Sequence, residues 1–177
     1  MGIMKSPSVC LIAVVCLLVS LSTSVVAGQD WRIELVPSRH SEGKGAVLYA
    51  TKSLDKFYIV LHNTSGKDQR LWRAWCPWGY ENFSLVAELE SGEKINLTRP
   101  PKKWGKSYPD AALVGAGKSY VFEIHLGGST WMGTKKLPQS PFKLTVSYQI
   151  PPTPEAEQKH VWTGKVSSHP LTVTLRQ

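Results

Sequence analysis

Apolar residues in this 177-residue chain recur at every second position in several short runs, and this period constrains the fold more than any other feature. Side chains of an extended strand point alternately to opposite faces, so each run offers one apolar face to a core. No long stretch has the period of about 3.6 residues that is typical of an amphipathic helix. The runs with this alternation, or close to it, are residues 31–35, 57–61, 83–89, 120–126, 142–150, 161–166 and 171–175.

Turn-forming residues separate these runs. Glycine and asparagine tolerate the positive φ of tight turns, and they occur at residues 63–66, 90–93, 115–117 and 127–128. Proline cannot donate a ladder hydrogen bond, so Pro100-Pro101 and Pro151-Pro152 indicate loops. Short strands with turns between them predict an all-β fold with little helix, an antiparallel β-sandwich of about seven to nine strands. Two longer loops are expected, at residues 99–110 and 127–141.

Residues 1–27 are predicted to be a secretory signal peptide. Lys5 supplies a short positive region, residues 9–19 are apolar, and Val25 and Ala27 suit the two small-residue positions before a cleavage site. The apolar run is too short for a membrane span, and no second run is long enough. We therefore expect a secreted or periplasmic protein cleaved near Ala27. Residues 28–177 would form a single β-sandwich domain, and 150 residues suffice for a single core.

Basic residues outnumber acidic ones, and this affects the partners that we expect. The chain has 21 Lys and Arg against 13 Asp and Glu, and its net charge of +8 falls to +7 when Lys5 is removed. Such a surplus favours acidic partners, among them anionic polysaccharides. If the charges are dispersed, the surplus merely keeps a secreted protein in solution. Export argues against nucleic acid as the natural partner.

The segment 71–83 concentrates aromatic side chains. Its candidate ligand-binding residues are Trp72, Trp75, Trp78 and Tyr80. Flat indole rings stack on the apolar faces of sugars, which favours a sugar- or peptide-binding platform. Alternatively the rings close one end of the sandwich, because sandwich cores commonly bury a tryptophan. Pro77 and Gly79 predict that a strand breaks into a turn here and that the chain resumes as a strand at Phe83.

The loop at residues 99–108 interleaves cations with aromatic rings. Its candidate ligand-binding residues are Lys102, Lys103, Trp104 and Lys106. Cations attract an anionic polymer while an aromatic ring stacks on it, so an acidic glycan or a protein surface is the expected partner. The alternative is a solvated basic loop whose Trp104 folds back over the sheet edge. The two candidate segments form one contact surface only if folding brings them together.

Cys76 is the single cysteine that remains after signal cleavage, so an intrachain disulfide is impossible. It could act as a nucleophile, a metal ligand or an intermolecular disulfide partner, but free cysteines are usually buried, and a buried, inert thiol is expected. The histidines lack a short ligand spacing, and no nucleophile elbow occurs. We therefore expect no metal, no cofactor and no catalysis. An enzyme that uses Cys76 or a carboxylate pair remains an alternative.

Parts of the chain resemble secreted bacterial immunoglobulin-like sandwich proteins, in which a strand ends in Asn plus a polar turn and a glycine-marked turn leads a later strand. The segments that carry the resemblance are residues 57–66, 113–124, 142–148 and 168–175. The paired cysteines of antibody-type domains are absent, which excludes that subfamily. The resemblance implies an all-β, antiparallel immunoglobulin-like β-sandwich. A likeness of fold does not by itself imply a function, and from the residues we expect a non-catalytic binding or structural module. Bacterial proteinase-inhibitor domains of this fold are similar too, and a protein-surface binder of this kind would present Trp131 and Met132 on an exposed loop.

Three triplets fit the acceptor pattern for N-glycosylation. They are Asn63-Thr64-Ser65, Asn82-Phe83-Ser84 and Asn96-Leu97-Thr98. The pattern matters only in a host that glycosylates exported chains. A glycan on Asn82 would block the neighbouring aromatic segment.

Overall fold

The computed structural model describes residues 30–37, 46–49, 56–126 and 130–176, and the predicted signal peptide lies outside them. Within these ranges the chain is mostly strand, with two short α-helices and one 3₁₀ turn. The strands are β1 (Trp31–Pro37), β2 (Ala46–Tyr49), β3 (Lys56–Asn63), β4 (Gln69–Trp72), β5 (Phe83–Glu88), β6 (Lys94–Leu97), β7 (Ala111–Val114), β8 (Ser119–His125), β9 (Phe142–Ile150), β10 (Gly164–Ser167) and β11 (Leu171–Arg176). The helical turns are α1 (Pro77–Tyr80), η1 (Thr134–Lys136) and α2 (Pro154–Gln158).

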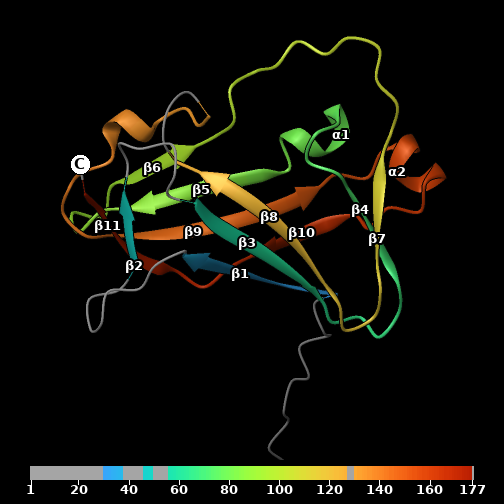
Figure 1. The fold of residues 1–177 in the computed structure, drawn as a ribbon, viewed down its shortest axis with the longest axis horizontal. Coiled ribbons are helices and arrows are strands. Elements are labelled where there is room, and N and C mark those ends of the chain that lie inside the picture. Colours follow the sequence, from blue (N-terminus) through green and yellow to red (C-terminus); the bar gives the residue numbers. More distant parts are fainter. Residues whose placement is uncertain (1–29, 38–45, 50–55, 127–129, 177) are drawn as a thin grey trace, which may run out of the picture.

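The strands form three sheets, and their pairing is almost entirely antiparallel (Figure 1). One sheet has the order β1-β3-β8. The largest has the order β2-β11-β9-β5-β6, with β10 also paired to β9, and β4 pairs with β7 in a sheet of two strands. Among these described strands, β2 and β11 are the parallel pair. The prediction of an all-β, antiparallel fold is confirmed.

The described residues contain eleven strands, more than the predicted range of about seven to nine. The excess arises from strands of four residues, namely β2, β4, β6 and β7. Four residues are too few to show a clear period of two, so these strands left no signal in the sequence. The predicted run at residues 161–166 is also shorter than expected. It begins as β10 at Gly164, whereas Val161 makes an isolated bridge to Arg70.

Buried residues of the three-stranded sheet and of the largest sheet belong to one apolar core. Alternation predicts the buried face of the long strands correctly, because every second residue of β3 and of β9 is buried. Phe83 of β5 meets Phe122 of β8 edge to face, with ring centroids 4.3 Å apart. The ring centroid of Tyr148 in β9 lies 4.5 Å from that of Phe83. Aromatic pairs of this geometry contribute about 0.5–1.5 kcal/mol each beyond the area that they bury.

Two successive strands pair with the same edge of β9. β10 pairs with residues 147–150 of β9, and β11 pairs with residues 142–144. Ser168 lies buried between them. Its backbone N–H donates to the Val146 carbonyl (2.9 Å), and its Oγ accepts from the Val146 N–H (3.1 Å). Both backbone groups of Val146 are therefore satisfied at the point where the ladder is interrupted.

The buried hydroxyl of Tyr148 sets an alkaline limit on stability. Burial raises the pKa of Tyr148 above its ordinary value, and the neighbouring Asn82 side chain opposes this only in part. Burial also raises the pKa of half-buried Tyr120, against the opposing effect of the Arg73 guanidinium. A raised pKa in the folded state means that folding favours the protonated phenol. The stabilising contribution is then complete below the unfolded pKa of about 10 and is lost as the pH rises above it.

We therefore expect the free energy of unfolding to fall as the pH is raised above about 10. In Tyr148→Phe the fall should be shallower, because the contribution of the buried Tyr148 phenol is then absent. Urea unfolding of both proteins between about pH 8 and pH 11 measures the two slopes. Identical slopes in the two proteins would contradict the assignment to Tyr148.

Candidate binding surface

The Trp-rich segment forms a tight turn between β4 and β5. β4 ends at Trp72, α1 begins at Pro77 and β5 begins at Phe83, so the predicted break and restart are confirmed. Proline suits the first helical position because the N–H that it lacks would have no partner inside the helix. Gly79 allows the helix to approach the strand end. A Cβ at this position would overlap the carbonyl oxygen of Arg73 and lie 2.7 Å from its carbonyl carbon.

The aromatic residues of this segment occupy different environments. Trp72 is only 2% exposed, so it has no free ring face for a ligand and belongs to the core instead of the binding surface that we predicted for it. Trp78 is partly buried and packs against Trp72, with ring centroids 6.1 Å apart. Trp75 is 60% exposed, and Tyr80 is half-buried. A ligand therefore has direct access to Trp75 and, in part, to Tyr80.

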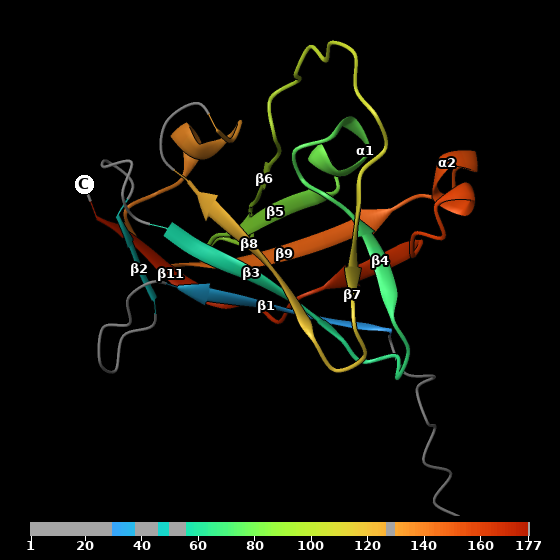
Figure 2. The same ribbon diagram turned by 45° about the vertical axis from the view of Figure 1, so that its right-hand side comes forward.

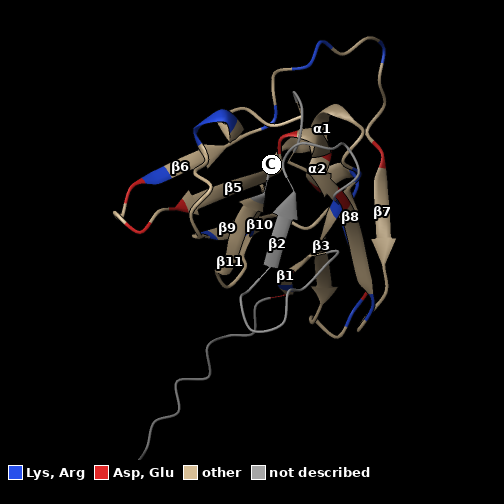
Figure 3. Ribbon diagram, turned by 60° about the vertical axis from the view of Figure 1, so that its left-hand side comes forward, with Lys and Arg blue, Asp and Glu red and all other residues tan. Residues whose placement is uncertain are grey.

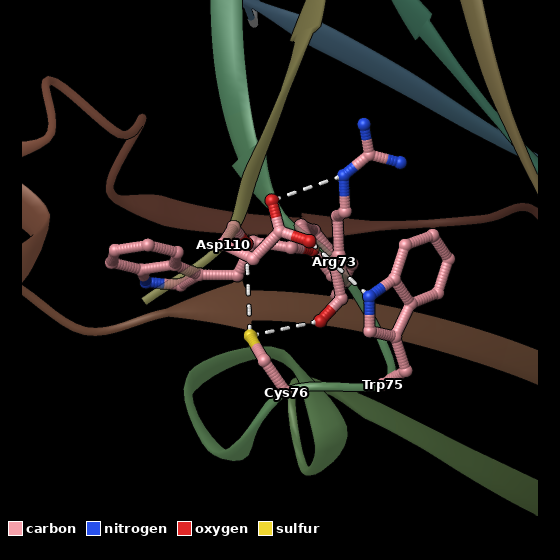
Figure 4. A network of polar contacts seen from close by, with 6 residues as sticks. Arg73, Trp75, Cys76 and Asp110 are labelled. Atoms are coloured by element: carbon pink, nitrogen blue, oxygen red, sulfur yellow. Dashed lines mark hydrogen bonds and ion pairs between the residues drawn. The ribbon is translucent and has the colours of Figure 1, made fainter. Parts of the chain in front are cut away.

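Asp110, at the end of the loop 99–110, holds Trp75 in place (Figure 4). One carboxylate oxygen accepts a hydrogen bond from Trp75 Nε1 (3.2 Å), and the other pairs with Arg73 Nε (3.3 Å). The Arg73 guanidinium also lies over the indole of Trp75, 4.9 Å from its centroid. Each contact at such an exposed position contributes about 0.5–1 kcal/mol. Together they fix the orientation of an otherwise exposed indole.

Cys76 is buried beside this network, which confirms the predicted burial. Its Sγ lies 3.2 Å from the carbonyl oxygen of Arg73, to which it donates, and 3.6 Å from that of Asp110 (Figure 4). These partners are backbone carbonyls, whereas an activated thiolate needs a base or a cation beside it. In the part of the chain that the structure describes, no three His, Cys, Asp or Glu side chains form a group able to hold a metal. Nor does that part contain a helix long and apolar enough to cross a membrane.

The beginning of the same loop packs around Tyr80. The Arg99 guanidinium lies 4.8 Å from the Tyr80 centroid, and Lys102 Nζ lies 5.7 Å from it. Trp104 stands edge-on to Tyr80 with centroids 5.4 Å apart, and Lys102 Nζ lies 4.4 Å from the Trp104 centroid. Folding thus brings Tyr80, Lys102 and Trp104 together from the two predicted segments. Lys103 is exposed on the same loop.

Arg99 belongs to this surface, although we did not single it out from the sequence. Its guanidinium lies between the rings of Tyr80 and Trp131, and its burial lowers the pKa of Arg99 below its ordinary value. Nη1 donates to the Ala74 carbonyl at 3.5 Å, whereas Nε is buried and has no hydrogen-bond partner among the described residues. Burying a cation without a counter-ion is costly, so an anionic ligand is favoured here. The available sequence signal was its place among the four cations of the loop at residues 99–108.

The hypothesis of a protein-surface binder required Trp131 to be exposed on the loop at residues 127–141, of which the structure describes residues 130–141. It is not exposed. Trp131 is 3% exposed and packs into the core. Met132 is exposed, but its backbone N–H donates to the Thr98 carbonyl at 2.8 Å. The loop 99–110 extends away from the sheets, as Figures 1 and 2 show. Tyr108 on this loop is 77% exposed.

No family model, curated protein or solved structure matches this chain. The role of the surface is therefore inferred from its own geometry. That geometry combines an anchored exposed indole at one end of the loop with a cluster of cations and rings at the other.

The loop 99–110 carries four basic residues and one acid (Figure 3). Its basic residues are Arg99, Lys102, Lys103 and Lys106. Its acid, Asp110, is paired with Arg73. Among the described residues, clefts of about 300–500 Å³ lie elsewhere, beside the β5–β6 hairpin, beside α2 and between β1 and β11. The surface is an open basic platform, which suits a polymer better than a small enclosed ligand.

Proposed function

We propose that this protein is an exported, non-catalytic binding module that contacts an acidic glycan or another acidic cell-surface polymer. The observation that carries the proposal is the cluster of Arg99, Lys102 and Trp104 around Tyr80. It places cations beside aromatic rings, and no described carboxylate pairs with Arg99 or Lys102. Trp75 adds a third ring, which is bonded to Asp110 at the other end of the same loop.

The chemistry of an acidic sugar polymer complements this arrangement. Rings stack on the apolar faces of the sugars, while ammonium and guanidinium groups pair with carboxylate or sulfate groups. The contacts of Trp75 with Asp110 and Arg73 order its ring before binding, and this lowers the entropy lost on association. Exposed Lys103 and Lys106 add long-range attraction that salt would weaken.

Two further parts of the proposal concern architecture and location. The two sheets and their shared core support an immunoglobulin-like sandwich as the finer description of the fold. The pattern of residues 1–27 supports a signal peptide and a secreted or periplasmic location.

Binding to an acidic polysaccharide tests the proposal directly. Purified residues 28–177 should be retarded by polygalacturonate but not by neutral dextran in affinity electrophoresis, with retardation weakening as salt is raised. Lys102→Ala and Trp104→Ala should each lower the affinity about tenfold, equivalent to about 1.4 kcal/mol. The matched control is Lys118→Ala, which removes one exposed positive charge from the β7–β8 turn.

An equal loss of affinity in Lys118→Ala would show that net charge alone drives binding, and it would contradict a defined surface. Absence of binding to polygalacturonate and to a sulfated polysaccharide would contradict the glycan proposal altogether.

A protein-surface binder, such as a proteinase inhibitor, is the second candidate. The outward extension of the loop 99–110 and the exposure of Tyr108 favour it. Trypsin is a suitable probe because the loop carries three lysines. Inhibition of trypsin that is lost in Lys103→Ala or Lys106→Ala would support this candidate. Rapid cleavage of the loop without inhibition would argue against it.

A further inference from the structure

The three asparagines of the N-glycosylation triplets differ in how accessible their amides are. N-glycosylation forms a bond between the asparagine Nδ2 and C1 of a lipid-linked oligosaccharide. The bond from C1 to the pyrophosphate oxygen breaks, the lipid pyrophosphate leaves, and the amide gives up one proton. The product is compatible with a fold only if Nδ2 faces solvent with room for the first sugar. We propose that Asn96 alone of the three can carry an N-glycan on the folded protein. This inference rests on the export that is part of the proposed function, but not on the proposed binding to an acidic polymer.

Asn63 is enclosed by its hydrogen-bond partners. It is 1% exposed, and its Nδ2 donates to the carbonyls of Lys67 (2.7 Å), Val114 (2.9 Å) and Gly115 (3.1 Å). Its Oδ1 accepts from the N–H (3.1 Å) and the Oγ (2.7 Å) of Ser65. A sugar on Nδ2 would replace one of two amide hydrogens and would need space that these carbonyls occupy. A glycan at Asn63 is therefore incompatible with the native turn.

Asn82 lies between α1 and β5, beside the core. Its Nδ2 is buried, and its side chain is close enough to the Tyr148 hydroxyl to affect the pKa of that group. The backbone carbonyl of Asn82 accepts from the Gln149 N–H (2.9 Å), which fixes this position against the end of β9. A glycan at Asn82 would have to move the side chain away from Tyr148 and open the junction between α1 and β5.

Asn96 lies on β6, the terminal strand of the largest sheet, and its side chain is exposed. The strand alternates, so Ile95 and Leu97 point into the core while Asn96 and Thr98 face solvent. The cross-strand neighbour of Asn96 is half-buried Val86. A sugar attached here extends into solvent and displaces no core side chain.

Secretion from cultured mammalian cells, which attach N-glycans to exported chains, tests this assignment. The full chain is expressed, and the secreted protein is digested and analysed by mass spectrometry after enzymatic deglycosylation, which converts each glycosylated Asn to Asp. We expect glycosylation at Asn96, its loss in Thr98→Ala and no change in Ser84→Ala. A folded, secreted protein with a glycan at Asn63 or Asn82, or with Asn96 unmodified, would overturn the assignment.

Transfer onto the nascent chain precedes folding, so a fraction of molecules modified at Asn63 should be retained in the cell. Ser65→Ala, which removes that triplet and keeps Asn63, should then increase secretion while Asn96 stays glycosylated. A second readout does not require secretion: folded protein from bacteria is incubated with purified oligosaccharyltransferase and a lipid-linked oligosaccharide. Modification of Asn96 supports the assignment, and modification of Asn63 or Asn82, or of none of the three, overturns it.

Discussion

Asn63→Asp is expected to lower the free energy of unfolding by about 4 kcal/mol at neutral pH. The change is nearly isosteric, but it replaces the amide donor by an acceptor. In the native protein that donor serves three carbonyl oxygens within 3.1 Å. A carboxylate would face these oxygens as a buried charge without donors on that side. The turn after β3 and the β7–β8 turn, which Asn63 joins, would then separate.

Urea unfolding measures this loss, with Asn96→Asp as the matched control. Asn96 is exposed on β6, so its substitution should change stability by less than about 0.5 kcal/mol. Lowering the pH should narrow the gap between Asn63→Asp and the wild type, because protonation removes the buried charge and returns one donor. Equal losses in the two variants, or a gap independent of pH, would contradict this account of Asn63.

Gly79→Ala is expected to cost about 3 kcal/mol of stability. Helix propensity alone would favour alanine by about 1 kcal/mol, so a net loss can only come from the steric contact. The added Cβ would overlap the carbonyl oxygen of Arg73. This carbonyl cannot easily move away, because it accepts from both the N–H and the Sγ of Cys76, each at 3.2 Å. The Arg73 N–H is also bonded to the Asp110 carbonyl at 3.0 Å.

Gly105→Ala is the control for this experiment, because a Cβ at Gly105 would meet no atom within 4 Å. Thermal unfolding should show a clear decrease for Gly79→Ala and little change for Gly105→Ala. Tryptophan quenching by acrylamide should also increase in Gly79→Ala, since movement of Arg73 releases Trp75 from Asp110. Similar melting temperatures for the two variants would mean that the turn accommodates the extra methyl group.

Alternation predicted the long strands because each spans enough residues to show which face is buried. It failed for β4 and β7, whose four residues are held by pairing between segments far apart in the chain. It also could not predict that Trp72 is buried whereas Trp75 is exposed. The strand ends at Trp72, so face alternation no longer applies three residues later, and the position of Trp75 is set by Asp110 on the distant loop.

The burial of Cys76 could be predicted from its residue type alone, because free cysteines are usually buried. The role of Arg99 required knowledge of two neighbours, Tyr80 and Trp131, that come from separate parts of the sequence. Charge and aromatic content predicted that the loop and the Trp-rich segment are candidates for binding. Only the folded structure shows that Tyr80, and not Trp72, joins the loop residues.

The position of β11 in the largest sheet has a consequence for the timing of folding. β11 lies between β2 and β9, so Ala46 near one end of the chain pairs with Val173 near the other. A growing chain therefore cannot complete this sheet until nearly all of its residues have been synthesised. Pairings so distant in sequence also form slowly. During that delay β2 lacks its partner strand, and the stretch of β9 that will pair with β11 stays open on that edge.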